Sequence, residues 1–390
     1  MYTPYRLSPG GGEKVFLTAL SSYQQLGYHI LLFLDPAKFC QTIDCIRQAA
    51  EKLLIEDIDW TRVKVILDAR RHSHISTWYN VDAYFEIGNT KAPRNFGLGR
   101  RHNLYTCQFP FDLDTPLSSE SLDILGSYDD VMVYSNYVHF WYMNYTLNDI
   151  IRSNGRVKLP PVRVVAPPVG GKHHETLTTN SLTMLHQKQG ASSTFNILML
   201  GRIFYARQNK GYHVAVPTFK RLLQADHGEH DLHLHIIGAL SQIKGSKEYL
   251  AQLQSNASTL PITFHTGIAE DKLQSLLRNG SIFWHMTGID QPRDHFDPAS
   301  LEHFGIAHLE AMAYGMIPIV TDRGGPIETT RHGIDGYHAA SPEEFVRYTL
   351  QILRMDSDER VKMRRAAIES SKRFSPDKFI ANMMKLVRQG

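Results

Sequence analysis

The stretch that decides the fold reads Ser300-Leu-Glu-His-Phe-Gly-Ile-Ala-His-Leu-Glu-Ala-Met-Ala-Tyr-Gly315, and the apolar run Met316-Ile-Pro-Ile-Val-Thr321 follows it. The small and apolar residues after Gly305 predict a buried helix, and the run that follows predicts a strand. Gly305 can turn the chain so that the amides near Ile306 open the helix. Such a helix start presents unpaired N–H groups to an anion such as phosphate.

Two glutamates in this stretch, Glu302 and Glu310, are candidate ligand-binding residues. Glu302 precedes the predicted helix, whereas Glu310 falls about one turn into it, where a carboxylate accepts hydrogen bonds from sugar hydroxyls. On one continuous helix they would lie ~12 Å apart and would hold opposite ends of an extended ligand. Ordinary surface glutamates are the alternative. A carboxylate on a buried apolar helix needs a partner, however, and a ligand is the simplest one.

Short apolar runs alternate with helical segments on both sides of this stretch. In the second half they lie at 195–201, 233–238, 262–265, 281–285 and 317–321. The first half repeats the pattern at 29–34, 63–67, 83–87, 104–109 and 130–134. Strands that alternate with helices predict an α/β fold, in which parallel sheets carry helices on both faces.

Two cations flank the turn after the first strand of the second half. Arg202 follows Gly201, and Lys210 precedes Gly211 and the next predicted helix. Ligands bind at the carboxyl ends of strands in open parallel sheets, so this pair is a candidate clamp for a diphosphate. Two solvated surface charges are the alternative interpretation.

A glycine loop, Gly10-Gly-Gly-Glu13, leads into the first predicted helix. Gly11 and Gly12 allow a phosphate to approach the backbone, although a flexible turn explains a glycine triplet equally well. A doubly wound domain has a strand before such a loop, and only residues 1–5 are available for it. The sequence therefore predicts that the first strand is very short or missing.

Composition and charge exclude several classes of function. At 390 residues the chain is long enough for two domains, and a formal charge of +3 gives little field for holding a nucleic-acid backbone. The cysteines form no C-x-x-C pair, so neither a disulfide framework nor a thiolate zinc site is expected; they are Cys40, Cys45 and Cys107. No membrane-spanning run or signal-peptide core is found, which favours a cytoplasmic protein.

Together these motifs resemble those of retaining glycosyltransferases with the GT-B fold, specifically glycosyltransferase family 4. The resemblance covers nearly the whole chain and is strongest over residues 282–336. The motifs are Gly-Gly-Gly-Glu at 10–13, Pro-Pro-Val at 167–169, Gly-Arg at 201–202, Lys-Gly at 210–211, Ile-Phe-Trp-His at 282–285, Glu-His-Phe-Gly-Ile at 302–306 with Glu310, and Gly-Gly-Pro-Ile-Glu at 324–328.

The resemblance implies two doubly wound, Rossmann-like domains that face each other across a cleft. We place an acceptor-side domain at residues 1–168 and a nucleotide-sugar-binding domain at 169–372. Residues 373–390 would then form a C-terminal helix that crosses back to the first domain.

By resemblance, the catalytic residues are Glu302, near the donor hexose, and the cations Arg202 and Lys210, which stabilise charge on the departing phosphate. Glu310 matches the ribose-binding glutamate, and Gly267 lies where the family seats the nucleotide base. The full set of expected substrate-binding residues is Gly11, Gly12, Gly201, Gly267, Ile268, His303, Phe304, Gly305, Ile306 and Glu310. His285 is a further candidate partner for sugar hydroxyls.

The expected activity is retaining, metal-independent transfer of a mannose- or glucose-type hexose from a GDP- or UDP-sugar to a glycan or glycolipid acceptor. No cofactor is expected, because Asp112-Leu-Asp114 is interpreted as a solvated acidic loop. The alternative is a catalytically silent sugar-nucleotide-binding or scaffold protein. Gln108 supports it, since many relatives have a histidine there and glutamine takes no proton near neutral pH. An NAD-dependent oxidoreductase is disfavoured, because the loop at 10–13 lacks the G-x-G-x-x-G spacing.

The remaining polar clusters carry weaker signals. Histidines at 72 and 74, 173 and 174, and 233 and 235 lack metal-ligand spacing and are expected to be structural or exposed. Peripheral contact with lipid headgroups at the cytosolic face of a membrane is one interpretation of the basic residues Arg70, Arg71, Lys91, Arg94, Arg100 and Arg101. Ordinary solvated charge is the other, and no nucleic-acid partner is expected.

Overall fold

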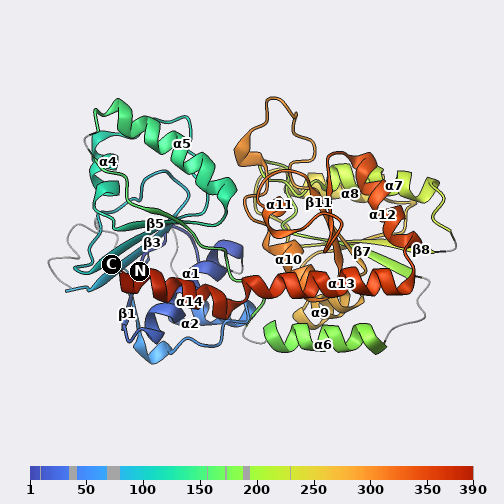
Figure 1. Cartoon of the computed structure of the whole chain (residues 1–390), viewed down its shortest axis with the longest axis horizontal. Coiled ribbons are helices and arrows are strands. Elements are labelled where there is room, and N and C mark those ends of the chain that lie inside the picture. Colours follow the sequence, from blue (N-terminus) through green and yellow to red (C-terminus); the bar gives the residue numbers. More distant parts are fainter. Residues whose placement is uncertain are drawn as a thin grey trace. The chain divides into compact units, whose positions relative to one another are not determined.

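The computed structural model describes residues 1–8, 10–34, 42–67, 80–155, 157–171, 174–187, 194–228 and 230–389. The chain divides into two compact units (Figure 1). Unit 1 comprises Met1–Lys172 with Phe374–Gly390, and unit 2 comprises His173–Arg373. Residues named above that lie outside the described part are Cys40, Arg70, Arg71, His72, His74 and His173.

Unit 1 is built on parallel strands, and all but the last of those described coincide with the apolar runs of the first half. The strands are β1 Ile30–Leu34, β2 Val63–Leu67, β3 Ala83–Gly88, β4 His102–Cys107, β5 Asp130–Val133 and β6 Val162–Val164. β1 pairs with β2, and β3 to β6 form a second group in chain order. These strands are nearly continuous in apolar residues because helices cover both faces of a parallel sheet.

The first strand of unit 1 is present as a single bridging residue. Tyr2 forms parallel bridges to Phe33 of β1 and to Glu86 of β3. Its N–H donates to the carbonyl of Phe85 at 2.8 Å, and its own carbonyl accepts from the N–H of Ile87 at 3.2 Å. Tyr2 thus pairs with both β1 and β3 as an isolated bridge, in the position where a first strand would lie.

The helices of unit 1 include one from the far end of the chain. They are α1 Gly11–Gln25, α2 Ile43–Lys52, α4 Ser119–Gly126, α5 Asn136–Arg152 and α14 Pro376–Gln389, with the 3₁₀ turn η1 Trp60–Arg62. α14 packs against α1, which is buried from Lys14 to Gln24 (Figure 1).

Unit 2 contains one six-stranded parallel sheet, in the order β12-β11-β10-β7-β8-β9. The strands are β7 Thr194–Leu200, β8 Asp231–Ile237, β9 Ile262–His265, β10 Ile282–His285, β11 Ile317–Thr321 and β12 Tyr337–Ala339. β12 was not predicted, because three residues are too few to show as an apolar run.

Helices cover both faces of this sheet. Figure 1 shows α7 Tyr212–Gln224, α8 Ser246–Asn256 and α12 Pro342–Arg354 on one face, with α6 His174–Gln187, α9 Glu270–Asn279 and α13 Ser357–Ser371 on the other. α10 Ile306–Ala313 packs against α13. The shorter elements are α11 Pro326–Thr329 and the 3₁₀ turns η3 Pro298–Ser300 and η4 Lys372–Phe374. None of the described helices has the length and apolar character that crossing a membrane requires.

Alternate residues of the central strands fill two separate cores. Ile197 and Met199 of β7 join the larger core, while Leu198 between them joins the smaller one. Because all six strands run in parallel, their carboxyl ends share one edge of the sheet. Gly201, His285 and Thr321 stand at or just after the ends of β7, β10 and β11, so this edge positions the candidate site.

Candidate functional site

Lys210, His285 and Glu302 meet at the carboxyl edge of the unit 2 sheet. Lys210 stands two residues before α7, and His285 is the last residue of β10. Glu302 Oε2 accepts hydrogen bonds from Lys210 Nζ at 2.7 Å and from His285 Nε2 at 3.1 Å. Two of the three predicted catalytic residues are therefore in direct contact.

Glu302 is held as a carboxylate. Its side chain is 14% exposed, and burial by itself would raise its pKa. The charge of Lys210 and the hydrogen bond from His285 outweigh burial and hold the pKa of Glu302 well below its usual range. At neutral pH this group accepts hydrogen bonds, for example from a sugar hydroxyl, and has no proton to donate.

Gly305 places Glu302 before the helix, as the sequence predicts. Gly305 is the N-cap of α10 with φ 94°, in the left-handed region that favours glycine. A Cβ there would lie 2.4 Å from His308 Cε1. The N–H of Gly325 donates to the carbonyl of Glu302 at 2.8 Å, and a Cβ on Gly324 would lie 2.4 Å from the oxygen of that carbonyl. The backbone of Glu302 is thus fixed from two sides.

Arg202 lies apart from this contact. Its side chain is exposed and its guanidinium stands over the ring of Phe204, 5.5 Å from the centroid. No hydrogen bond or ion pair between described residues joins it to Lys210 or Glu302. Gly201 allows Lys210 to cross the strand end, since a Cβ there would lie 2.8 Å from Lys210 Cγ. Lys210 reaches the loop before α10, whereas Arg202 lies in the turn after β7.

Glu310 differs from its prediction. Its side chain is half-buried, because α10 turns Leu309, Ala311 and Met312 inward and leaves Glu310 in contact with solvent. The expectation of a buried carboxylate on this helix was therefore wrong, and burial no longer argues for a ligand at Glu310. A role in ribose binding stays a prediction.

The other predicted residues of the 303–306 loop form its wall. His303 and Phe304 are buried, and Ile306 is half-buried. Gln208, a residue that the sequence analysis missed, lies with its Nε2 2.9 Å from His303 Nδ1. Burial lowers the pKa of His303 to about 3, so this ring is neutral.

The predicted base-binding turn follows β9. Gly267 has φ 66° and open space where a Cβ would stand, whereas Ile268 packs against the smaller core of unit 2. The turn thus exposes main chain, and its role in binding a base stays a prediction.

In unit 1 the glycine loop meets Gln108. Gly11 is the first residue of α1, and a Cβ on Gly12 would lie 2.3 Å from Gln108 Oε1. Gly12 therefore leaves room for the side chain of Gln108. Gly12 and Gln108 are therefore neighbours within unit 1.

Two expectations about charged residues of unit 1 were wrong. Asp112 is half-buried rather than solvated; its carboxylate accepts from the N–H of Lys91 at 2.8 Å, and burial raises its pKa. Lys91 is buried, with Nζ 2.6 Å from the Asp149 carboxylate, so it does not contact lipid headgroups. Both residues serve the interior of unit 1.

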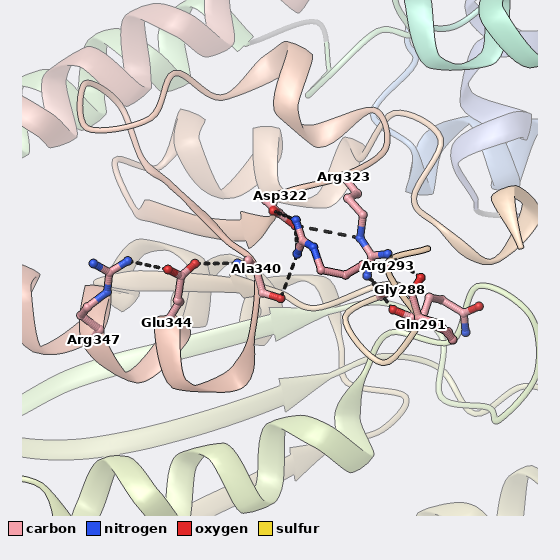
Figure 2. A network of polar contacts seen from close by, with 9 residues as sticks. Gly288, Gln291, Arg293, Asp322, Arg323, Ala340, Glu344 and Arg347 are labelled. Atoms are coloured by element: carbon pink, nitrogen blue, oxygen red, sulfur yellow. Dashed lines mark hydrogen bonds and ion pairs between the residues drawn. The ribbon is translucent and has the colours of Figure 1, made fainter. Parts of the chain in front are cut away.

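An arginine network fixes the segment between β10 and Glu302 (Figure 2). Arg323 donates to the carbonyls of Gly288 at 3.1 Å and Gln291 at 2.9 Å. Arg293 bonds the Asp322 carboxylate at 2.6 Å, as Figure 2 shows. The sequence analysis missed these residues, although Asp322 and Arg323 directly follow a predicted strand at the ligand-binding edge.

Comparisons with known proteins agree with this architecture. Residues 184–373 match the family model described as Glycosyl transferases group 1. A GDP-Man:Man(3)GlcNAc(2)-PP-Dol alpha-1,2-mannosyltransferase of Dictyostelium discoideum is 28% identical over 199 residues, which span 49% of this chain and 37% of that relative. Only about a third of the relative is thus matched.

Solved structures with the same fold cover the whole chain. HepE of Anabaena, in complex with UDP and glucose, has a TM-score of 0.64 at 16% identity and covers 100% of this chain and 99% of its own. A glycosyltransferase of Rickettsia africae has a TM-score of 0.68 at 16% identity and covers 100% and 97%. The fold is therefore GT-B, and residues 184–373 are similar to the Glycosyl transferases group 1 family.

Proposed function

We propose that this chain is a retaining glycosyltransferase that moves a hexose from a nucleoside diphosphate sugar to a glycan or lipid-linked glycan acceptor. The observation that carries the proposal is the contact of Lys210 and Glu302 beside a helix that begins at Gly305. This arrangement brings a cation, a carboxylate and the start of a helix together at one edge of the sheet, inside the region that matches the family model.

In the proposed reaction the leaving group is a nucleoside diphosphate. Lys210, Arg202 and the first amides of α10 stabilise the negative charge that develops on its phosphate oxygen. Glu302, held as a carboxylate, accepts a hydrogen bond from a hydroxyl of the donor hexose. These residues supply the charge without a metal ion, and metal independence is part of the proposal.

GDP-mannose is the donor that we propose first. The relatives that match about half of this chain are named as GDP-Man-dependent mannosyltransferases, whereas the UDP complexes belong to proteins that share only the fold. The same relatives act on a lipid-linked oligosaccharide, which makes that class the first acceptor to test. UDP-glucose is the second donor.

The test is transfer of radiolabelled mannose to a dolichol-linked oligosaccharide, with and without EDTA. We expect transfer with retained anomeric configuration, unaffected by EDTA, and a loss of about 100-fold or more in Glu302→Gln. Glu343→Gln, an exposed glutamate on α12, is the matched control. Tight GDP binding with no transfer or hydrolysis for any donor would instead support a sugar-nucleotide-binding protein without catalysis.

A further inference from the structure

An exposed apolar face runs along α5 of unit 1. Phe140, Leu147 and Ile151 are 57%, 38% and 70% exposed, and they recur at helical spacing. Between them stand Asn144 and Asn148, which are also exposed and uncharged. A helix that faces water normally carries charge on its outer side, so this face indicates a contact.

Aromatic rings extend this face. Tyr137, Trp141 and Tyr145 follow one another at one-turn spacing, with ring centroids 6.2 and 6.1 Å apart. Phe109 stacks on Tyr137, and Phe111, 37% exposed, packs edge-on against Phe109. The α5 patch is defined here as Phe111, Tyr137, Phe140, Trp141, Leu147 and Ile151.

Positive charge borders the α5 patch at the carboxyl end of the helix. Arg152, Lys158 and Arg163 are exposed on or just after α5. Asp149 is the only acidic residue between residues 136 and 164, and it is buried in the ion pair with Lys91. The patch and its border therefore combine apolar and aromatic side chains with exposed cations at one end, of which Arg152 lies 3.9 Å from the Asp149 carboxylate and Arg163 pairs with Asp130 at 3.1 Å.

We propose that the α5 patch docks on the interfacial region of a bilayer that contains anionic lipid. Tryptophan and tyrosine favour the headgroup level, and phenylalanine, leucine and isoleucine favour the acyl boundary below it. The cations at the helix end meet lipid phosphates. A carbohydrate fits this surface less well. The most exposed side chains of the α5 patch, those of Phe140 and Ile151, offer no hydrogen-bonding group to sugar hydroxyls. The proposal does not depend on the transfer activity.

Vesicle flotation of the full chain tests the proposal. We expect binding to phosphatidylcholine vesicles that contain phosphatidylglycerol and a loss of about tenfold or more in the double variant Phe140→Ser/Ile151→Ser. The matched control is Ile243→Ser/Ile334→Ser in unit 2, where the same change is made at isoleucines that are 47% and 53% exposed. Arg152→Gln/Lys158→Gln should weaken binding at low salt and change it little at high salt.

Tryptophan fluorescence gives an independent readout. Anionic vesicles should shift the emission of the wild type to shorter wavelength, and Trp141→Phe should remove that shift. Circular dichroism checks that every variant is folded. The proposal is overturned if the wild type does not float, or if both double variants float equally. It is also overturned if Phe140→Ser/Ile151→Ser instead abolishes a dimer formed without vesicles, since the occupant is then a second copy of the chain.

Discussion

Lys210 Nζ lies 2.7 Å from Glu302 Oε2, although 92 residues separate the two in the sequence. The contact joins the cation proposed for the donor phosphate to the carboxylate proposed for the donor sugar. The two roles are therefore coupled, and a change at either residue alters the surroundings of the other.

Replacing Lys210 by methionine should weaken nucleoside diphosphate binding by about 10- to 100-fold, since a charge-assisted hydrogen bond contributes roughly 1.5–3 kcal/mol. Calorimetric titration with GDP and UDP measures this loss. Lys220→Met, an exposed lysine on α7, should leave affinity unchanged. Equal affinities for wild type and Lys210→Met would remove Lys210 from the proposed clamp.

The acid stability of the protein should depend on the same pair. The pKa of Glu302 is depressed in the folded state, so its contribution to the free energy of unfolding is present above about pH 4.5 and is lost as the pH falls through the depressed value. In Lys210→Met the pKa of Glu302 rises toward or above its ordinary value, so the loss of stability below about pH 4.5 should become smaller or disappear. Urea unfolding between about pH 3 and pH 7 measures this. When Glu302→Gln is added to both proteins, their free energies of unfolding should depend on pH in the same way. If Lys210→Met alone loses stability below about pH 4.5 as the wild type does, the prediction is contradicted.

The turn before α10 should not tolerate a side chain. Gly305→Ala forces an L residue into the left-handed region, at about 1–2 kcal/mol, and its Cβ must also displace the buried His308. Gly333→Ala is a matched control with φ 73° and open space around the Cβ. Thermal unfolding should therefore show the larger loss for Gly305→Ala, by roughly 1–3 kcal/mol. Equal losses would mean that His308 moves aside freely.

Arg323 should control the mobility of the segment that leads to Glu302. Arg323→Lys removes the forked donors that bind the carbonyls of Gly288 and Gln291, because an ammonium has no such geometry. Hydrogen exchange over residues 286–301 should become faster and transfer slower. Arg347→Lys, exposed on α12, serves as the control (Figure 2). Unchanged exchange in Arg323→Lys would show that other contacts hold the segment.

Most of the sheet could be predicted from the sequence, because strands buried on both faces are continuous apolar runs. Residues 63–67, 262–265 and 317–321 match the observed strands at both ends. β12 and the bridge at Tyr2 are too short to give such a signal. Both are defined by hydrogen bonds to neighbouring strands, and a local sequence pattern carries no information about such pairing.

The backbone turn of the candidate site could be predicted from the sequence, whereas the side-chain contacts could not. Gly305 shows in the sequence that Glu302 stands before the helix, since glycine marks the turn. The hydrogen bonds that Glu302 receives from Lys210 and His285 depend on β10 lying beside β7 in the sheet, and strand order is not encoded in the spacing of motifs. The half-exposed position of Glu310 depends on how α10 is rotated against its neighbours.

Because α14 belongs to unit 1, this unit is assembled from segments on both sides of unit 2 in the sequence. α1 is synthesised before unit 2, and the helix that packs against it is made only after all of unit 2. The interior of unit 1 thus stays incomplete while its neighbour is synthesised and folds. A stop codon just after position 374 would spare every residue of unit 2 and still remove α14, so damage from such a truncation would appear in unit 1.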